Sequence, residues 1–200
     1  MRVLLAEDMQ LLRGSLVSLL HQEADIEVVA EVARGDDILP SALRTEPDLA
    51  LIDIGLPGMD GLSAAAQLHQ QLPSCRCLIV TSLGWPGNIR RALEAHASGF
   101  LLKDTPPDQL VLAMRKVIAG ERVIDSELAV SALESAPSPF TPREAEVLRC
   151  AAEGAPPQEI AEQLHLELST VRNYLSKVVT KSGARNRVDT IRIALQEGWI

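Results

Sequence analysis

Aromatic residues are scarce in this chain, and Phe, Trp and Tyr together make up 2% of its 200 residues. Its cores must therefore be built from aliphatic side chains, and a hydrophobic fraction of 46% is sufficient for that. No apolar run approaches the roughly 20 residues that a membrane-spanning helix needs. The first residues also lack the long apolar run and the small-residue cleavage site of a secretory signal. These absences predict a cytoplasmic protein with no membrane partner.

Cysteine is also rare, and the spacing of the three residues excludes two common kinds of site. Cys75 and Cys77 are two positions apart, and Cys150 is distant from both. The sequence "CRC" has neither the spacing of a zinc knuckle nor that of a redox-active Cys-x-x-Cys pair. The three cysteines are therefore expected to be reduced structural thiols.

The chain has no net positive charge, and its net negative charge lies in one part of the sequence. From residue 140 to the end there are eight basic and eight acidic side chains, so the net charge of −8 belongs to residues 1–139. Such asymmetry indicates two modules with different partners. Residues 121–139 include a Ser- and Pro-rich stretch typical of a linker, with room for a short helix around 125–135. We predict domains at 1–120 and 140–200.

Apolar runs alternate with amphipathic helical stretches through the first 120 residues. Strands are predicted at 2–6, 26–32, 49–53, 77–82 and 99–103, and a last helix at 106–119. Near-continuous apolar strands separated by helices indicate a parallel sheet that is covered on both faces. The predicted fold is an α/β doubly wound, five-stranded parallel sheet.

Acidic side chains follow two of these strands at the point where each strand ends. Glu7 and Asp8 follow the first strand, and Asp53 ends the third. Because the carboxyl ends of parallel strands meet at the same edge of a sheet, we expect the three carboxylates to lie close together. Carboxylates this close repel one another, and a hard divalent cation with oxygen ligands, such as Mg²⁺, relieves that repulsion. The sequence therefore predicts a magnesium site at this edge.

The fourth and fifth strands end in Thr81 and Lys103, which places a hydroxyl and an ammonium group at the same edge. Carboxylates, a metal ion, a hydroxyl and a lysine form the set needed to hold a phosphoryl group on a carboxylate oxygen. The alternative is that each acid only caps the helix that follows it. For one acid alone that alternative is favoured. It would, however, make the presence of all five side chains at the ends of four different strands a coincidence.

Residues 1 to about 120 resemble the receiver domain of bacterial two-component response regulators. The matching residues are Glu7, Asp8, Asp53, "LPGMDG", Thr81 and "FLLKD", which contains Lys103. The resemblance implies that a sensor histidine kinase phosphorylates Asp53 and that Thr81 and Lys103 contact the phosphoryl oxygens. It also implies Mg²⁺ ligands at Glu7, Asp8, Asp53 and the Gly55 carbonyl, an aromatic switch at Phe100, and a loop shaped by Pro57 and Gly61. One departure is Asp104, where many receivers have Pro.

Beyond Phe140 the pattern is purely helical. Thr141, Pro142 and Glu144 have the spacing of a capping box that opens a helix, and Gly154 is expected to end it. "PPQEIAEQLH", "STVRNYLSKVVTKSG" and "RVDTIRIALQEG" predict three more helices, the second of them ended by Gly183. The result is an all-α four-helix domain.

The third of these helices carries the basic charge of the domain. From Thr170 to Arg187 inclusive there are five basic residues and no acid. An apolar stripe at Val171, Leu175, Val178 and Val179 leaves the polar and basic side chains facing outward. The alternative is a solvated basic helix, but a preceding Pro-initiated helix and a short turn favour a helix-turn-helix that binds double-stranded DNA.

Residues 140–200 resemble the LuxR-type, or NarL/FixJ-type, DNA-binding domain through "FTPREAEVLRCAAEG", "EIAEQLHL", "STVRNYLSKV" and "KSGARNR". The resemblance implies base contacts from Arg172, Asn173 and Ser176. Further DNA contacts are expected from Thr170, Lys177, Lys181 and Arg185. The whole chain most resembles the regulators paired with membrane-sensing kinases of the lipid-desaturase thermosensor type. "LHLELST" departs from the family, so the third helix is expected to begin with Ser169 as its cap, after a partly buried His165.

The predicted function is a response regulator that accepts a phosphoryl group on Asp53 and binds DNA as a phosphorylation-favoured homodimer, with RNA polymerase as a further partner if it activates transcription. The rival enzyme is an aspartyl-phosphate phosphatase, which needs a second Asp two residues after the nucleophile, where this chain has Gly55. A constitutive DNA-binding protein with a degenerate receiver would lack an acid, the Thr or the Lys, and none is missing. The chain is therefore not expected to be an enzyme.

Overall fold

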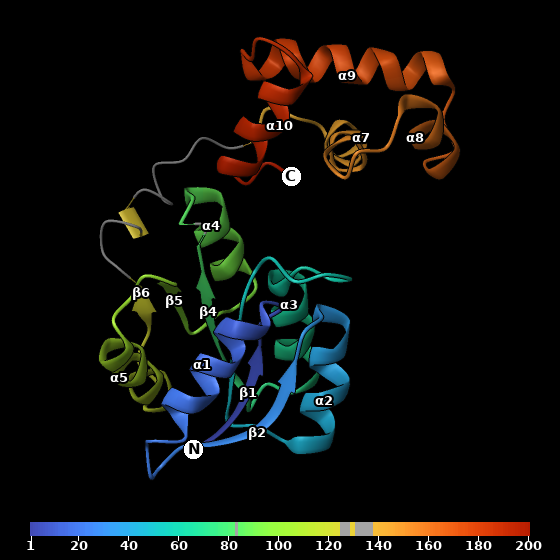
Figure 1. Cartoon of the computed structure of the whole chain (residues 1–200). Helices are drawn as coiled ribbons and strands as arrows, with labels where there is room; N and C mark the ends of the chain where they lie inside the picture. The colour runs from blue at the N-terminus through green and yellow to red at the C-terminus, as the bar shows by residue number, and fades with distance from the viewer. Residues whose placement is uncertain (83, 125–128, 131–137) are drawn as a thin grey trace. The chain divides into compact units, whose positions relative to one another are not determined.

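The computed structural model of the chain describes residues 1–82, 84–124, 129–130 and 138–200 (Figure 1). The chain divides into two compact units, Met1–Gly84 with Ile89–Val130, and Trp85–Asn88 with Ser131–Ile200. Most of the short helix expected around 125–135 lies outside the described residues. No helix in the part of the chain that the structure describes has the length and apolar character needed to cross a membrane.

The first unit is built on one parallel sheet with the strand order β2-β1-β3-β4-β5-β6. Its strands are β1 (Arg2–Ala6), β2 (Glu27–Val32), β3 (Leu49–Ile52), β4 (Arg76–Thr81), β5 (Gly99–Leu102) and β6 (Val123–Ile124). The chain therefore leaves β1 toward one edge of the sheet and returns to β3 on its other side. In open α/β sheets of this order, ligands bind beyond the carboxyl ends of the strands on either side of that switch point.

The sheet has six strands, so the prediction of five was wrong by one. Val123 and Ile124 pair with Gly99 and Phe100 at the edge of the sheet. A strand of two residues is too short to show the apolar run by which the other five were predicted. It also falls in the stretch 121–139 that was assigned to the linker.

Helices cover both faces of the sheet (Figure 1). On one face, α1 (Gln10–Leu20) and α5 (Pro107–Ile118) pack on a core that includes Leu5, Leu51 and Val80. The other helices of the unit are η1 (Gly35–Asp37), α2 (Ile38–Thr45), α3 (Gly61–Gln71) and the part of α4 (Pro86–Glu94) from Ile89 onward. Of these, α2 packs on β1 and β2, and α3 packs on β4. The buried apolar strands thus follow the two-sided pattern expected of a parallel sheet.

The second unit consists of four helices, α7 (Pro142–Ala152), α8 (Pro157–Gln163), α9 (Leu168–Ser182) and α10 (Arg187–Gln196). The predicted capping box is present, since the Thr141 hydroxyl accepts from the Glu144 N–H and the Glu144 carboxylate accepts from the Thr141 N–H. Gly154 and Gly183 follow α7 and α9 with φ values of 96° and 66°, which glycine adopts without strain. Both predicted helix ends are confirmed.

The turn between α8 and α9 differs from the prediction in two respects. Helix α9 begins at Leu168 with Glu167 at its N-cap, so Ser169 lies inside the first turn and is not the cap. His165 is exposed and has a φ of 52°, whereas a partly buried side chain was expected. A turn this short needs one residue in the left-handed region after α8, and the sequence places a histidine there.

Candidate functional site

The acidic cluster lies where β1 and β3 end side by side. The Glu7 N–H donates to the Val32 carbonyl at 3.1 Å, and the Asp53 N–H donates to the Ala6 carbonyl at 3.0 Å. These bonds continue the hydrogen bonding of the sheet one residue beyond the strands. The backbone of both acidic residues is therefore fixed by the sheet. Tertiary pairing of the strands thus brings together side chains that are far apart in the sequence.

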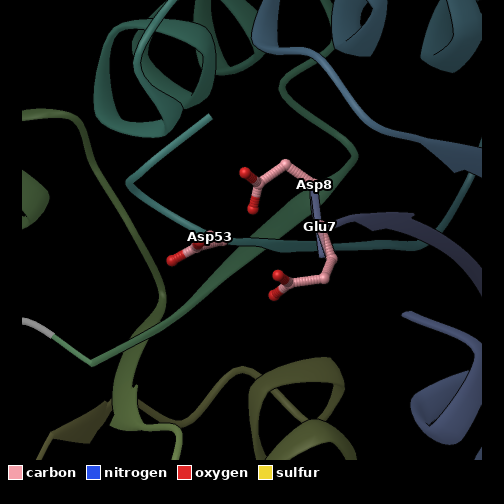
Figure 2. A group of neighbouring side chains, drawn as sticks. All are labelled: Glu7, Asp8 and Asp53. Carbon is pink, nitrogen blue, oxygen red and sulfur yellow. The ribbon is translucent and has the colours of Figure 1, made fainter. Parts of the chain in front are cut away.

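Figure 2 shows the carboxylates of Glu7, Asp8 and Asp53 gathered at this edge of the sheet. One ligand oxygen from each lies within 4.8 Å of the others. Glu7 and Asp53 are 2% and 8% exposed, while Asp8 is exposed. Three carboxylate oxygens at this separation match the oxygen ligands that Mg²⁺ prefers, and the exposed Asp8 leaves an open side for water.

Lys103 joins the two buried carboxylates. Its Nζ lies 2.7 Å from Glu7 Oε2 and 2.9 Å from Asp53 Oδ2. Burial alone would lower the pKa of Lys103, but the hydrogen bonds to Glu7 and Asp53 outweigh that effect and raise it. The ammonium group is therefore charged and stands beside the carboxylate oxygen of Asp53.

The loop after Asp53 requires glycine at position 61 and places Gly55 beside the acidic side chain. A Cβ on Gly61 would lie 1.9 Å from the Asp53 carbonyl oxygen, so only glycine lets the start of α3 pass this close to the strand end. The Gly61 N–H donates to the Ile54 carbonyl at 2.9 Å and closes the loop. A Cβ on Gly55 would lie 3.6 Å from Asp53 Oδ2, so this residue borders the acidic side chain.

Thr81 and Phe100 complete the predicted receiver residues. Thr81 ends β4 and is 1% exposed, and its carbonyl accepts from the Lys103 N–H at 2.9 Å. Phe100 lies on β5 and is also 1% exposed. The structure therefore shows the aromatic ring turned inward.

Sequence analysis did not single out Arg13, although it supports the acidic edge. Its guanidinium group donates to the Glu7 carbonyl at 2.6 Å and lies 3.7 Å from the Glu31 carboxylate. It therefore ties α1 to the ends of β1 and β2. An arginine in the second turn of an amphipathic helix gives no sequence signal that separates this role from ordinary solvent exposure.

In the second unit, α9 presents the predicted DNA-contact residues on one side. Val171, Leu175 and Val178 are buried, and Arg172, Asn173, Ser176 and Lys177 are exposed, while Thr170 is half-buried in the first turn. Arg172 and Lys177 form no ion pair within the described residues. Two positive charges and two neutral polar groups are therefore available on this side of the helix.

The other two basic positions are already paired within the unit. Lys181 Nζ lies 2.6 Å from Glu144 Oε2, and Arg185 Nε lies 3.3 Å from Asp189 Oδ2. The first pair joins the end of α9 to the start of α7, and the second holds Arg185 at the start of α10. Both side chains keep further N–H donors that these pairs do not use.

Glu144 is the buried partner in the first of these pairs. Burial alone would raise its pKa, but hydrogen bonds from Lys181 and from the Thr141 backbone outweigh burial and lower the pKa below its ordinary value of 4.5. A lowered pKa means that the carboxylate stabilises the folded unit above about pH 4.5. That stabilisation is lost as the pH falls through the folded-state pKa.

We expect Glu144→Gln to lower the free energy of unfolding by about 1–3 kcal/mol at neutral pH, because the buried capping and ion-pair groups lose their charged acceptor. The variant should also lose less stability than the wild type as the pH falls below 4.5. Urea denaturation at several pH values measures both effects. Glu146→Gln is the matched control, since Glu146 pairs with Arg143 in a half-exposed position. Equal losses in the two variants would contradict the assignment.

Comparisons with known proteins cover both units. The chain matches the response regulator receiver domain over residues 3–115 and the luxR family of bacterial regulatory proteins over residues 138–194. It is 39% identical over 197 residues to the transcriptional regulatory protein DesR of Bacillus subtilis, and the match spans 98% of each chain. It is 38% identical over 199 residues to the response regulator RamR of Streptomyces coelicolor, spanning 99% of this chain and 97% of RamR.

Solved structures of response regulators have a similar fold. The response regulator ChrA of a heme-sensing two-component system is 32% identical, with a TM-score of 0.58 over 100% of this chain and 98% of ChrA. RcsB of Salmonella enterica serovar Typhimurium, solved on a promoter with a phosphomimetic, gives a TM-score of 0.71 over 96% of each chain. At 23% identity, that second likeness supports the fold alone.

Proposed function

Because this chain belongs to the LuxR-type (NarL/FixJ) response regulators, with DesR among the relatives that fit the expected subgroup, we propose that a sensor histidine kinase phosphorylates it on Asp53. The family consists of transcription regulators and not of enzymes. The observation that carries the proposal is the contact of one lysine ammonium with the buried carboxylates of Asp53 and Glu7. That contact places a positive charge beside the oxygen that would accept the phosphoryl group.

In the proposed reaction, a carboxylate oxygen of Asp53 attacks the phosphorus of a phosphohistidine on the kinase. A new P–O bond forms, the P–N bond breaks, and its electron pair returns to the imidazole nitrogen. Lys103 offsets the negative charge on the transferred oxygens, as positioned cations do in phosphoryl transfer. The Thr81 hydroxyl would donate a hydrogen bond to one of those oxygens.

The acidic edge fits Mg²⁺, because three carboxylate oxygens come within 4.8 Å of one another and no softer ligand is among them. Glu7, Asp8, Asp53 and the Gly55 carbonyl would hold the ion. When bound, Mg²⁺ supplies charge neutralisation and orientation for the phosphoryl group. The residues of this chain would then supply the nucleophile, the lysine ammonium and the Thr81 hydroxyl.

We expect Asp8→Asn to weaken Mg²⁺ binding about tenfold or more, on the scale seen when support of a metal site is lost. The exposed Asp8 carboxylate contributes a full charge, whereas an asparagine oxygen does not. Isothermal titration of the full chain with Mg²⁺ measures the change. Asp108→Asn removes an exposed carboxylate from the first turn of α5 and serves as the control. An Asp8 variant with wild-type affinity would remove this residue from the proposed site.

We propose that α9 enters the major groove and contacts base edges through Arg172, Asn173 and Ser176, which are exposed on one side of the helix. Arg and Asn are suited to guanine and adenine, respectively. Thr170, Lys177, Lys181 and Arg185 would contact the backbone, and Lys181 would do so while still paired with Glu144. RNA polymerase would be a further partner if the protein activates transcription.

Phosphorylation is proposed to favour a homodimer that binds two half-sites about 34 Å apart or a multiple of that spacing. Two exposed leucines support a dimer face made by α1 and α5, because Leu11 is 83% exposed and Leu112 is 53% exposed. Removal of such exposed apolar surface from water favours association. A second copy of the receiver would bury both.

The test is the mass and the oligomeric state of the full chain after incubation with acetyl phosphate and Mg²⁺. We expect one phosphoryl adduct and a shift from monomer to dimer. The Leu11→Asp variant should gain the adduct and remain monomeric, because a charge on the proposed face would be buried unpaired. A wild-type chain that gains no adduct contradicts the proposed phosphorylation, and a Leu11 variant that still dimerises contradicts the proposed face.

A further inference from the structure

An apolar cavity of about 220 Å³ lies between α1, the sheet and α5. Its walls include Leu5, Leu16, Leu51, Val80 and Leu110, and its polar end is formed by Lys103 with the neighbouring carboxylates. An engineered apolar cavity of roughly 150 Å³ in another protein stays dry and binds benzene. The cavity in this chain is larger, and away from its polar end its walls are mostly aliphatic.

The cavity is left unfilled because most of the surrounding side chains are short and aliphatic. The chain has only two Phe, two Trp and one Tyr, and none of them is among the residues that line this space. An unfilled apolar space forfeits dispersion contacts along its whole lining. A molecule that restores those contacts would bind favourably without any change in the surrounding fold.

Charge at the polar end limits what can bind. The Lys103 ammonium is already held by Glu7 and Asp53, so this end of the cavity carries one positive and two negative charges. A ligand with a charged head group would have to displace one of these existing ion pairs, whereas an uncharged ligand would leave both in place. The other polar residues of the lining include Ser15 and Thr105.

We propose that this cavity binds a compact, uncharged aromatic molecule, of benzene to indole size, with no more than one hydroxyl or N–H group. A flat, rigid ring loses little conformational freedom on binding and fills the space between aliphatic walls. The binding inference goes beyond the proposed function, because it stands on the volume, the lining and the charge of the cavity. Its coupling to phosphorylation rests in addition on the proposed function.

Binding in this cavity is coupled to the acidic edge, because Asp53 and Lys103 belong to its lining. A ligand that fits the present arrangement stabilises the state in which Lys103 is held between the two carboxylates. Phosphorylation requires Lys103 to turn toward a new anion, so bound ligand slows the uptake of a phosphoryl group. The coupling is reciprocal, and phosphorylated protein binds the ligand more weakly.

The experiment uses full-length, unphosphorylated protein with benzene and indole as the probes. We expect saturable chemical-shift changes at residues of α1 and α5 and a rise in the unfolding temperature, as linkage requires. The Leu16→Phe variant fills the cavity from α1 and abolishes both effects. Leu43→Phe is the matched control on α2, where Leu43 is 49% exposed, and it should bind like the wild type.

Three results would overturn the inference. The first is that folded wild-type protein shows no saturable binding up to the solubility limit of both probes. The second is that Leu16→Phe and Leu43→Phe bind the probes equally well. The third is that saturating ligand leaves the phosphorylation rate unchanged. Leu110→Phe fills the same cavity from α5 and replaces Leu16→Phe in the comparison if that variant does not fold.

Discussion

The Asp53→Asn variant is expected to take up no phosphoryl group from acetyl phosphate under conditions in which the wild type takes up one. The amide of asparagine is not a nucleophile toward phosphorus, but it has the shape of the carboxylate and can accept the hydrogen bond from Lys103 that the wild type makes at 2.9 Å. Folding should therefore be retained. Intact-protein mass spectrometry measures the adduct, and circular dichroism confirms the fold.

Without the adduct, the variant should also lose the phosphorylation-dependent dimer and the associated gain in DNA affinity. The variant should remain monomeric in acetyl phosphate and gain no DNA affinity. Asp108→Asn is again the control, because it removes a carboxylate from the same unit without touching the acidic edge. An adduct that survives in the Asp53 variant would place the phosphoryl group on another residue.

The second large effect is expected on DNA binding. Arg172→Ala should cost about 1–3 kcal/mol of specific binding per half-site, which corresponds to roughly 5- to 150-fold in affinity. The side chain is exposed on α9 and has no ion-pair partner within the described residues, so its removal should leave the stability of the domain unchanged. Fluorescence anisotropy with an operator selected from a random DNA pool measures the loss.

Specificity separates a base contact from a general charge effect. With the Arg172 variant, preference at one base position should relax, and the dependence on salt should change little. Arg149→Ala removes an equal charge from an exposed position on α7 and is the matched control. If both variants weaken DNA binding equally and neither relaxes the base preference, Arg172 contributes only its positive charge. The proposed base contact would then be wrong.

Local features of the sequence were sufficient for most of the architecture. The first five strands and the helix at 106–119 were predicted within about two residues of their observed bounds, because hydrophobic periodicity is a local signal. The capping box at Thr141 and the glycines at 154 and 183 were also correct, since capping and left-handed backbone depend on neighbouring residues alone. The turn at His165 was not, because "LHLEL" lacks the glycine that usually marks such a backbone.

The sequence by itself determined which residues stand at the ends of the strands, and from this the acidic edge followed. Only the tertiary structure decided how those residues pair. Lys103 reaches Asp53 across 50 positions, and Lys181 reaches Glu144 across 37. Strand β6 and the cavity beneath α1 and α5 also exist only through packing. Hydrogen bonding and periodicity act over a few residues, whereas ion pairs, edge strands and unfilled volume depend on how separate elements meet in space.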